Sequence, residues 1–415
     1  TAKALTTNGF SKTGHTFLGW STSPSATTAT YTNGQSVTNL TATSGGTVTL
    51  YAVWKVNSYT LTFNPNGGTV SETSRKVVQG SPLGKLPVPT RPGYIFNGWF
   101  AYSYGGTQYT ESSIMGSSDL TIYACWTQKT TTLIDGPSFN STLLSMLGNC
   151  TKISFTSTSI PSNKISTAKI VSNSNSTNKA YMYVDGSTLF ISPDESGVSL
   201  IAPVDCTTMF LNAKTVTTLD LSNFNLTTST AIMKRMFQGM SSLTSLDVSK
   251  FKTSNVTDMM QTFQDCRSLT SLDVSKFSTS KVTTMNYMFY GCSSLKTLTL
   301  TPGVRPTFVT TSVTDMSFMF AGCNSLPTVN LSSFNTSKVT NMSSMFNGCL
   351  SLTSLNLANF NTSNVTSMSG MFADCRSLAS LNLSSFTDYN VTNFSYMFSE
   401  CINLSNLNIS NMGLH

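Results

Sequence analysis

Six cysteines recur at a nearly constant interval in the second half of this 415-residue sequence. They are Cys266, Cys292, Cys323, Cys349, Cys375 and Cys401, and every interval but one is 26 residues. Thiols placed so regularly could bind a metal, form a ladder of disulfides, act as a row of nucleophiles, or fill one buried position that repeats. Which of these four roles applies depends on the secondary structure that carries the cysteines.

The cysteines belong to a longer repeat. A phenylalanine column runs three residues ahead of them, at Phe210, Phe237, Phe263, Phe289, Phe320, Phe346, Phe372 and Phe398. A second column runs Leu219, Leu246, Leu272, Leu298, Val329, Leu355, Leu381 and Leu407. The one longer interval reflects an insertion around Thr301–Pro306. A period in this range is typical of stacked repeat proteins.

Each repeat contains two hydrophobic patterns. Residues 378–386 (LASLNLSSF) place apolar residues at strand spacing. Residues 365–375 (VTSMSGMFADC) place Val, Met, Phe and Cys at steps of three and four, which predicts a short helix. One strand and one short helix in each repeat of about 26 residues predict an α/β leucine-rich-repeat solenoid.

This pattern favours a structural role for the cysteines. Each would be the last inward residue of its helix, a small apolar side chain in a dry interior. Met240 occupies the same column one repeat earlier, which argues against a metal site or a nucleophile. Disulfides between adjacent repeats remain an alternative. We expect no metal and no cofactor.

The repeats, for example residues 255–277 (NVTDMMQTFQDCRSLTSLDVSKF), resemble those of BspA-like bacterial surface proteins, a branch also found in mycoplasma lipoproteins. About eight such repeats fill residues 207–415. We expect residues 129–206 to form an N-terminal cap, with a hairpin turning at Asp185-Gly186. Whether Cys150 and Cys206 in this cap, or Cys125 ahead of it, form disulfides stays open.

A different repeat occupies the front of the chain. TGHTFLGW (Thr13–Trp20) matches PGYIFNGW (Pro92–Trp99), and VTLYAVW (Val48–Trp54) matches LTIYACW (Leu120–Trp126). These units resemble the Listeria–Bacteroides repeat, the B-repeat type of internalin B. The resemblance implies two small β-grasp-like, β-rich modules, at 1–55 and 56–128. The first copy lacks the opening strand of the second, so we expect a fragment of a longer protein from which the signal and anchor are absent.

Composition argues against several classes of function. Only 10% of residues are charged, against about 25% in a typical domain. The net charge of +7 comes without any Lys/Arg-rich run, so we expect no nucleic-acid partner. The sequence contains no run of 18 or more apolar residues, so we expect no membrane span in this fragment. With two histidines, His15 and His415, no triad or Cys/His set can be assembled, and we predict that the protein is not an enzyme.

Two columns could carry a binding surface. The middle column of the strands reads Asp220, Asp247, Asp273, Thr299, Asn330, Asn356, Asn382 and Asn408, either a hydrogen-bonding strip or a solvated sheet face. Another column, beside the helical pattern, differs between repeats: Arg235, Gln261, Tyr287, Phe318, Ser344, Gly370 and Tyr396. Exposed aromatic residues near the insertion would suit a contact. We therefore predict the binding residues Tyr287, Tyr290, Phe318, Tyr396, Arg235 and Arg305.

These features, together with the resemblance, predict an extracellular adhesin, a monomer on the bacterial surface or cell wall. Its repeats would bind a host extracellular protein or glycan. One alternative is a structural stalk or spacer of a larger surface protein. Another is capture of host immunoglobulin or a different soluble defence protein.

Overall fold

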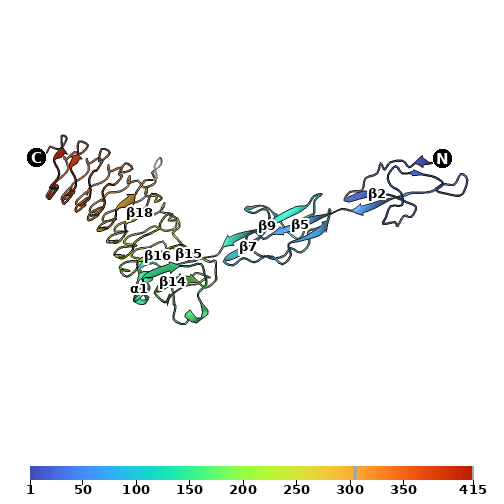
Figure 1. Cartoon of the computed structure of the whole chain (residues 1–415), viewed down its shortest axis with the longest axis horizontal. Coiled ribbons are helices and arrows are strands. Elements are labelled where there is room, and N and C mark those ends of the chain that lie inside the picture. The colour runs from blue at the N-terminus through green and yellow to red at the C-terminus, as the bar shows by residue number, and fades with distance from the viewer. Residues whose placement is uncertain (302–305, 414–415) are drawn as a thin grey trace. The chain divides into compact units, whose positions relative to one another are not determined.

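The computed structural model describes residues 1–301 and 306–413. The chain divides into two compact units, Thr1–Gln128 and Lys129–His415 (Figure 1). No helix within the described ranges is both long enough and apolar enough to cross a membrane.

The first unit begins with two small antiparallel sheets. Strand β1 (Lys3–Ala4) pairs with β3 (Ser36–Val37), and β2 (His15–Ser21) pairs with β4 (Tyr51–Val56). Their packing is largely aromatic, since the ring of Phe17 lies 5.2 Å from that of Trp20 and 5.4 Å from that of Trp54.

The rest of this unit is a five-stranded mixed sheet of order β6-β5-β9-β7-β8. Its strands are β5 (Ser58–Asn64), β6 (Ser74–Val78), β7 (Tyr94–Tyr102), β8 (Gly105–Tyr109) and β9 (Leu120–Gln128). Strands β5 and β9 run parallel, and the other neighbours are antiparallel. Leu61, Trp99 and Ile122 are buried in its core, where the Trp99 indole N–H donates to the carbonyl of Pro87.

The shared Gly-Trp motif has a physical cause. In both copies a bulge interrupts the pairing at the glycine, between Phe17 and Gly19 and between Phe96 and Gly98. Gly19 has φ 144° and Gly98 has φ 130°. A Cβ at Gly19 would lie 2.3 Å from the carbonyl oxygen of Tyr31. Only glycine combines this backbone angle with so close an approach.

The second unit opens with a helix and two sheets. Helix α1 (Gly136–Leu147) starts at Asp135, whose side chain accepts a hydrogen bond from the Ser138 N–H. The sheets are ordered β12-β13-β14-β11-β16 and β10-β15-β17. Their strands are β10 (Thr130–Thr132), β11 (Lys152–Phe155), β12 (Lys169–Ile170), β13 (Ala180–Asp185), β14 (Thr188–Pro193), β15 (Ser199–Ile201), β16 (Thr218–Asp220) and β17 (Phe224–Asn225), with a 3₁₀ turn η1 (Ser162–Lys164).

Two pairings organise this opening region. Strands β13 and β14 form the antiparallel hairpin predicted at Asp185-Gly186. Strand β11 pairs in parallel with β16, which joins the opening region to the first repeat. Phe139 of α1 and Phe155 of β11 belong to the same buried cluster as the repeats that follow.

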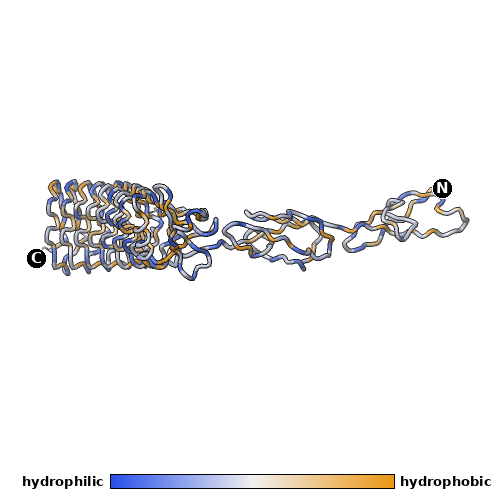
Figure 2. Tube along the Cα trace, turned by 90° about the horizontal axis from the view of Figure 1, so that it is seen from below, coloured by the Kyte–Doolittle hydropathy of each residue, from blue (hydrophilic) through white to orange (hydrophobic). Residues whose placement is uncertain are grey.

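Residues 205–412 form what we call the repeat stack, in which each repeat lies on the next in parallel register. Short strands pair where they occur, β18 (Ser271–Asp273) with β19 (Thr297–Thr299) and β20 (Ser380–Asn382) with β21 (Asn406–Asn408). A second row of parallel bridges runs through Asp205, Ile232, Asp258, Thr284, Asp315, Asn341, Ser367 and Asn393. Figure 2 shows apolar residues returning at the same place in successive turns.

The predicted α/β class is wrong, because the described residues of the repeats form no helix. The only α-helix within the described ranges is α1, and the unit is mostly short strands, bridges and turns. Each repeat instead places two residues at positive φ, such as Tyr287 at 58° and Gly291 at 69°. A right-handed helix cannot pass through left-handed residues four positions apart.

The hydrogen bonds explain how helical spacing arises without a helix. The N–H groups of Tyr287 and Phe289 donate to Ser317 and Met319 of the next repeat, at 3.0 and 2.9 Å. The N–H of Met288 donates backward to Met285 at 3.1 Å. The backbone thus alternates between bonds to the next repeat and i→i−3 turns. Consecutive turns also return side chains to the interior every three or four residues.

Aromatic stacking runs through the interior. The eight phenylalanines of the column that begins at Phe210 and ends at Phe398 stack with ring centroids 5.4 to 5.8 Å apart. All but Phe398, in the last repeat, are buried. Since each ring packs on the same ring of its neighbour, the interior requires the same residue type in every repeat.

Candidate interaction surface

The cysteine column lies in the interior, so the predicted structural role is confirmed, although no helix carries it. Cys401 is partly exposed and the other five are buried. The Cys292 thiol donates to the carbonyl of Phe263, one repeat earlier, at 3.2 Å. Burial raises the pKa of Cys292 and of Cys349 from 9.0 to about 12. These thiols stay protonated at neutral pH, which removes their nucleophilicity.

The remaining cysteines are free as well. Cys125, Cys150 and Cys206, whose pairing the sequence left open, form no disulfide. In the part of the chain that the structure describes, no group of three or more His, Cys, Asp or Glu side chains could hold a metal ion.

The Asp/Asn column has a local structural role. The carboxylate of Asp247 accepts the N–H of Ser249 at 2.9 Å, and Asp273 accepts that of Ser275 in the same way. Asn330 and Asn382 repeat this two-residue turn. Bonds from the Ser249 hydroxyl and N–H lower the pKa of Asp247. Asp and Asn recur here because their side chains close a turn with the backbone two residues on.

A buried threonine column was missed in the sequence. Its members are Thr253, Thr279, Thr310, Thr336 and Thr362, each at most 1% exposed. The Thr336 hydroxyl donates to the carbonyl of Asn361 at 2.9 Å and accepts its N–H at 2.8 Å. The signal was present as a threonine two residues after Phe in FKT, FST, FVT and FNT.

The residues of the column that differs between repeats all occupy the same position of the same backbone turn. Its residues are Arg235, Gln261, Tyr287, Phe318, Ser344, Gly370 and Tyr396, all with φ between 54° and 60°. We call the surface that they form the turn face. Because this φ recurs in every repeat, it belongs to the repeat and does not by itself mark a site. It leaves the side chain free to vary while the backbone stays bonded to the next repeat.

Three of the predicted residues come together on the turn face. The rings of Tyr287 and Phe318 stack with centroids 4.6 Å apart and planes 7° apart. Tyr290 lies 5.5 Å from Tyr287 and 6.3 Å from Phe318, nearly edge-on to the latter. All three are half-buried. Burial, with Tyr290 and Asp315 nearby, raises the pKa of Tyr287.

A polar network lies in the two repeats before this aromatic cluster. Arg235 Nε donates to Gln261 Oε1 at 2.6 Å, and Gln261 Nε2 donates to Gln264 Oε1 at 2.7 Å. Gln264 donates to Asp265, which also pairs with Arg267 at 3.0 Å. These planar groups hold one another in place beside the aromatic rings.

Tyr396 lies farther along the turn face, in the last repeat. Tyr396 is 77% exposed and is separated from Phe318 along the column by Ser344 and Gly370. Arg305 lies outside the described residues. The structure therefore brings Tyr287, Tyr290 and Phe318 into contact, while Arg235 connects to this region through Gln261.

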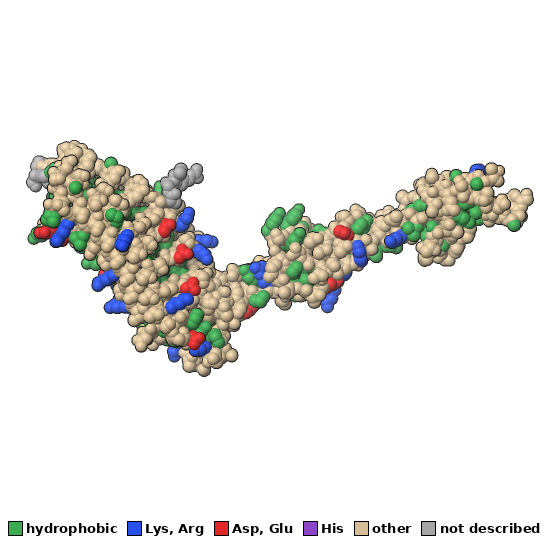
Figure 3. Space-filling model, viewed as in Figure 1, with side chains coloured by type: hydrophobic (Ala, Val, Ile, Leu, Met, Phe, Trp, Pro, Cys, Tyr) green, Lys and Arg blue, Asp and Glu red, His purple; other side chains and the backbone are tan. Residues whose placement is uncertain are grey.

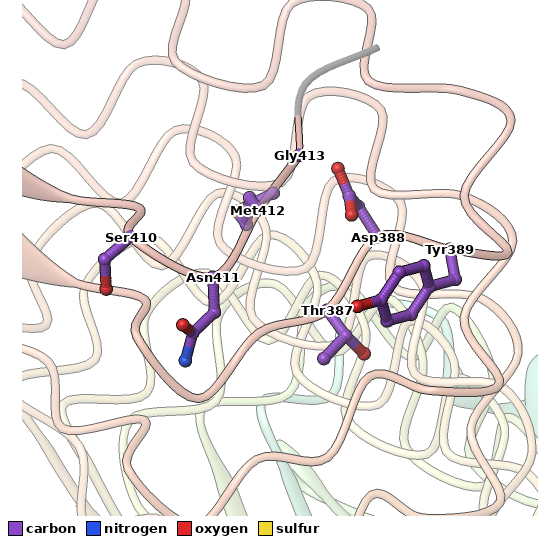
Figure 4. A pocket seen from close by; sticks show the side chains of 7 residues that line it. All are labelled: Thr387, Asp388, Tyr389, Ser410, Asn411, Met412 and Gly413. Carbon is purple, nitrogen blue, oxygen red and sulfur yellow. The ribbon is translucent and has the colours of Figure 1, made fainter.

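On the face in Figure 3, charged side chains are scattered over a surface that is mostly polar and uncharged. A shallow groove of about 430 Å³ lies in the last repeat, between residues 387–389 and 410–413. Figure 4 shows Thr387, Asp388 and Tyr389 on one segment and Ser410, Asn411 and Met412 on the other.

Comparison with known proteins now defines the class. Residues 1–53 and 59–125 match the Listeria-Bacteroides repeat domain. Residues 204–300 and 300–412 match the family described as "Mycoplasma protein of unknown function, DUF285". Since this match covers just over half of the sequence, the chain belongs to the DUF285 family. It is a BspA-like bacterial surface protein that carries Listeria–Bacteroides modules, as the sequence predicted.

Two relatives indicate where such segments occur. Internalin H of Listeria monocytogenes is 36% identical over 95 residues, which is 23% of this chain and 17% of internalin H. A protein of Evansella cellulosilytica named "Putative membrane protein" is 32% identical over 116 residues, or 28% of this chain and 16% of that protein. The chain thus matches less than a fifth of either curated relative. No solved structure matches it.

Proposed function

We propose that this surface protein is an adhesin that binds a host extracellular protein or glycan through the turn face of its repeat stack. The observation that carries the proposal is the cluster of Tyr287, Tyr290 and Phe318. Its rings stack at a position where the fold requires no particular side chain. Half-exposed aromatic residues beside hydrogen-bonding groups are typical of binding hot spots.

The repeat backbone supports this proposal. The main chain beneath Tyr287 and Phe318 is held by bonds to the following repeat, with the Phe318 N–H donating to Ser343 at 2.9 Å. A surface ordered before binding loses less conformational entropy on association. The Arg235–Gln261–Gln264 network adds ordered donors and acceptors next to the aromatic rings.

A non-enzymatic role is part of the proposal. The Cys292 and Cys349 thiols are buried and protonated at neutral pH, so neither supplies a nucleophile. We also propose that the protein acts as a monomer outside the cell, attached to the cell wall or envelope. Residues 1–55 and 56–128 would be spacer modules and residues 129–206 a cap on the repeats 207–415.

The test compares two variants of the whole chain for retention on host epithelial surfaces and on immobilised extracellular-matrix and mucosal proteins. Tyr287→Ala/Phe318→Ala should weaken retention at least tenfold. Tyr389→Ala removes a tyrosine that is 89% exposed but lies off the turn face, and it should have no effect.

Other outcomes select the alternatives. If the wild-type protein is retained on no host material, the adhesin proposal fails and the stalk or spacer becomes the better explanation. Retention from serum or secretions of immunoglobulin or another soluble defence protein, lost in the double variant, would identify the capture alternative.

A further inference from the structure

A second aromatic feature lies in the other unit of the chain, at the hairpin between β7 and β8. Tyr102 pairs with Gly105, so Ser103 and Tyr104 form the tip. The rings of Tyr102 and Tyr104 stack with centroids 5.3 Å apart and planes 5° apart. Tyr102 is 54% and Tyr104 84% exposed. Neither ring contributes to the buried core of the module.

Hydrogen bonds from Asn66 hold the backbone of the tip. Asn66 Nδ2 donates to the carbonyls of Ser103 and Ala124, at 2.9 and 3.0 Å. The Cys125 sulfur lies 3.6 Å from the carbonyl oxygen of Tyr102 and 3.7 Å from that of Ser103, so its single S–H can donate to either. Gly106 has φ 92°, and a Cβ there would lie 2.9 Å from the Tyr102 ring. The hairpin therefore holds the two rings in place before any ligand arrives.

The fold of the module does not require these tyrosines. In the preceding copy, which has the same Phe-x-Gly-Trp motif and the same bulge, Ser23 and Ser25 stand at the corresponding distances after the tryptophan. A sister sequence thus forms its strand pair without the aromatic residues. A stacked, exposed tyrosine pair that the fold does not need calls for a different explanation.

The area of the tyrosine pair and the charge of its hairpin indicate which kind of ligand it could bind. A buried tyrosine contributes 150–250 Å², so two rings offer at most about 300–500 Å². A stable protein interface buries about 800 Å² on each partner. Residues 92–110 contain no Lys, Arg, Asp or Glu. The neighbouring Arg91 donates to the Asn66 carbonyl and lies over the Tyr94 ring, so it is already engaged within the module. Ser103, between the two tyrosines, and Thr107, on strand β8, carry uncharged hydroxyl groups on the same hairpin.

We propose that Tyr102 and Tyr104 bind a neutral sugar ring of a glycan. The flat C–H face of a pyranose would lie on the exposed tyrosine ring, and its hydroxyls would bond to the polar groups around it. This site is separate from the turn face and does not depend on the function proposed for that face.

The experiment is saturation-transfer NMR on the whole chain with four neutral disaccharides: lactose, cellobiose, maltose and diacetylchitobiose. At least one should receive saturation at its ring C–H protons. Tyr104→Ala should reduce this transfer at least tenfold, whereas Tyr104→Phe, which keeps the ring, should retain it. Tyr104 is so exposed that both variants should melt at the wild-type temperature.

A second control separates this site from the turn face. Tyr287→Ala/Phe318→Ala should leave the saturation transfer unchanged. The proposal is overturned by the absence of transfer to all four sugars, by transfer that survives Tyr102→Ala/Tyr104→Ala, or by transfer that disappears in the turn-face variant. None of these outcomes bears on whether the turn face binds host material.

Discussion

The interior and the turn face of the repeat stack are built from the same short segment yet obey opposite rules. In residues 316–323, Met316, Phe320 and Cys323 point inward and have the same type of residue at nearly every repeat. Phe318, between them, lies on the turn face, where the other repeats have Arg, Gln, Tyr, Ser or Gly. The comparison shows that the interior positions maintain stability, while the turn-face positions are free to vary.

The cause of the difference is what each position contacts. An interior side chain packs against its counterpart in the next repeat, so a change leaves a cavity on two sides. A turn-face residue bonds to the next repeat through its backbone, whatever its side chain. Stability changes should therefore concentrate in the interior, and binding changes on the turn face.

The largest expected effect compares two phenylalanines that are two residues apart. Phe320 is fully buried and stacks on Phe289 and Phe346. Phe320→Ala should lower the free energy of unfolding by about 3–5 kcal/mol. Half-buried Phe318→Ala should cost less than about 1.5 kcal/mol. Guanidinium unfolding of the repeat-containing unit measures both. Equal losses for the two variants would remove the distinction between interior and turn face.

The buried thiols predict a loss of stability in alkali. Burial raises the pKa of Cys292 and Cys349 from 9.0 to about 12, so between these values the unfolded chain has lost the protons that the folded chain keeps. Stability is fully present below about pH 9 and falls as the pH rises toward 12. Each thiol contributes a slope of about 1.4 kcal/mol per pH unit.

The matched variant for this effect is Cys292→Ala/Cys349→Ala. Between pH 9.5 and 10.5, the free energy of unfolding of the wild type should fall by about 2.4 kcal/mol more than that of the variant. Tyrosine and lysine titrations are common to both proteins and cancel in the difference. Parallel slopes would mean that these thiols ionise in the folded protein.

The threonine column should show an intermediate effect. Thr336→Val keeps the shape but leaves the N–H and carbonyl of Asn361 without their bonds to the hydroxyl. The expected loss is about 1–3 kcal/mol by chemical unfolding. Thr336→Ser keeps the hydroxyl and should recover most of this loss. A Val variant as stable as the Ser variant would show that the hydroxyl is dispensable.

The smallest effect concerns the backbone of the turn face. Gly370 has φ 59°, and an added Cβ would lie 3.1 Å from the Ser344 hydroxyl. Gly370→Ala should cost about 1 kcal/mol through left-handed strain. Ser344→Gly, at the same position one repeat earlier, should be neutral or slightly stabilising. Thermal unfolding compares the two, and a stabilising Gly370→Ala would contradict the assigned turn.

The sequence correctly predicted which repeated residues lie in the interior, but it did not predict the backbone conformation of the repeats. The spacing of Phe and Cys placed both in the interior, as found. The three- and four-residue steps of Val365, Met368 and Met371 suggested a helix, yet tight turns that alternate with bonds between repeats give the same steps. No propensity scale would place Tyr287 or Phe318 at positive φ, because that angle is unfavourable for aromatic residues in isolation.

The candidate site was predictable in part. Tyr287, Tyr290 and Phe318 were expected to lie near one another, and their rings are in contact. For the Asp/Asn column the sequence left a hydrogen-bonding strip and a solvated sheet face both open, and did not predict that its side chains close turns. The sequence did not predict a site at Tyr102 and Tyr104, because these residues acquire their stacked geometry only from the β7–β8 hairpin.

The sequence by itself determined the family, the two kinds of repeat and the identity of the interior residues. Those depend on side-chain type at a fixed period, which can be read without coordinates. Only the tertiary structure decided which backbone carries that period, because the left-handed residues are stabilised by hydrogen bonds to the neighbouring repeat. A repeat taken alone lacks those partners, and with them the reason to turn where it does.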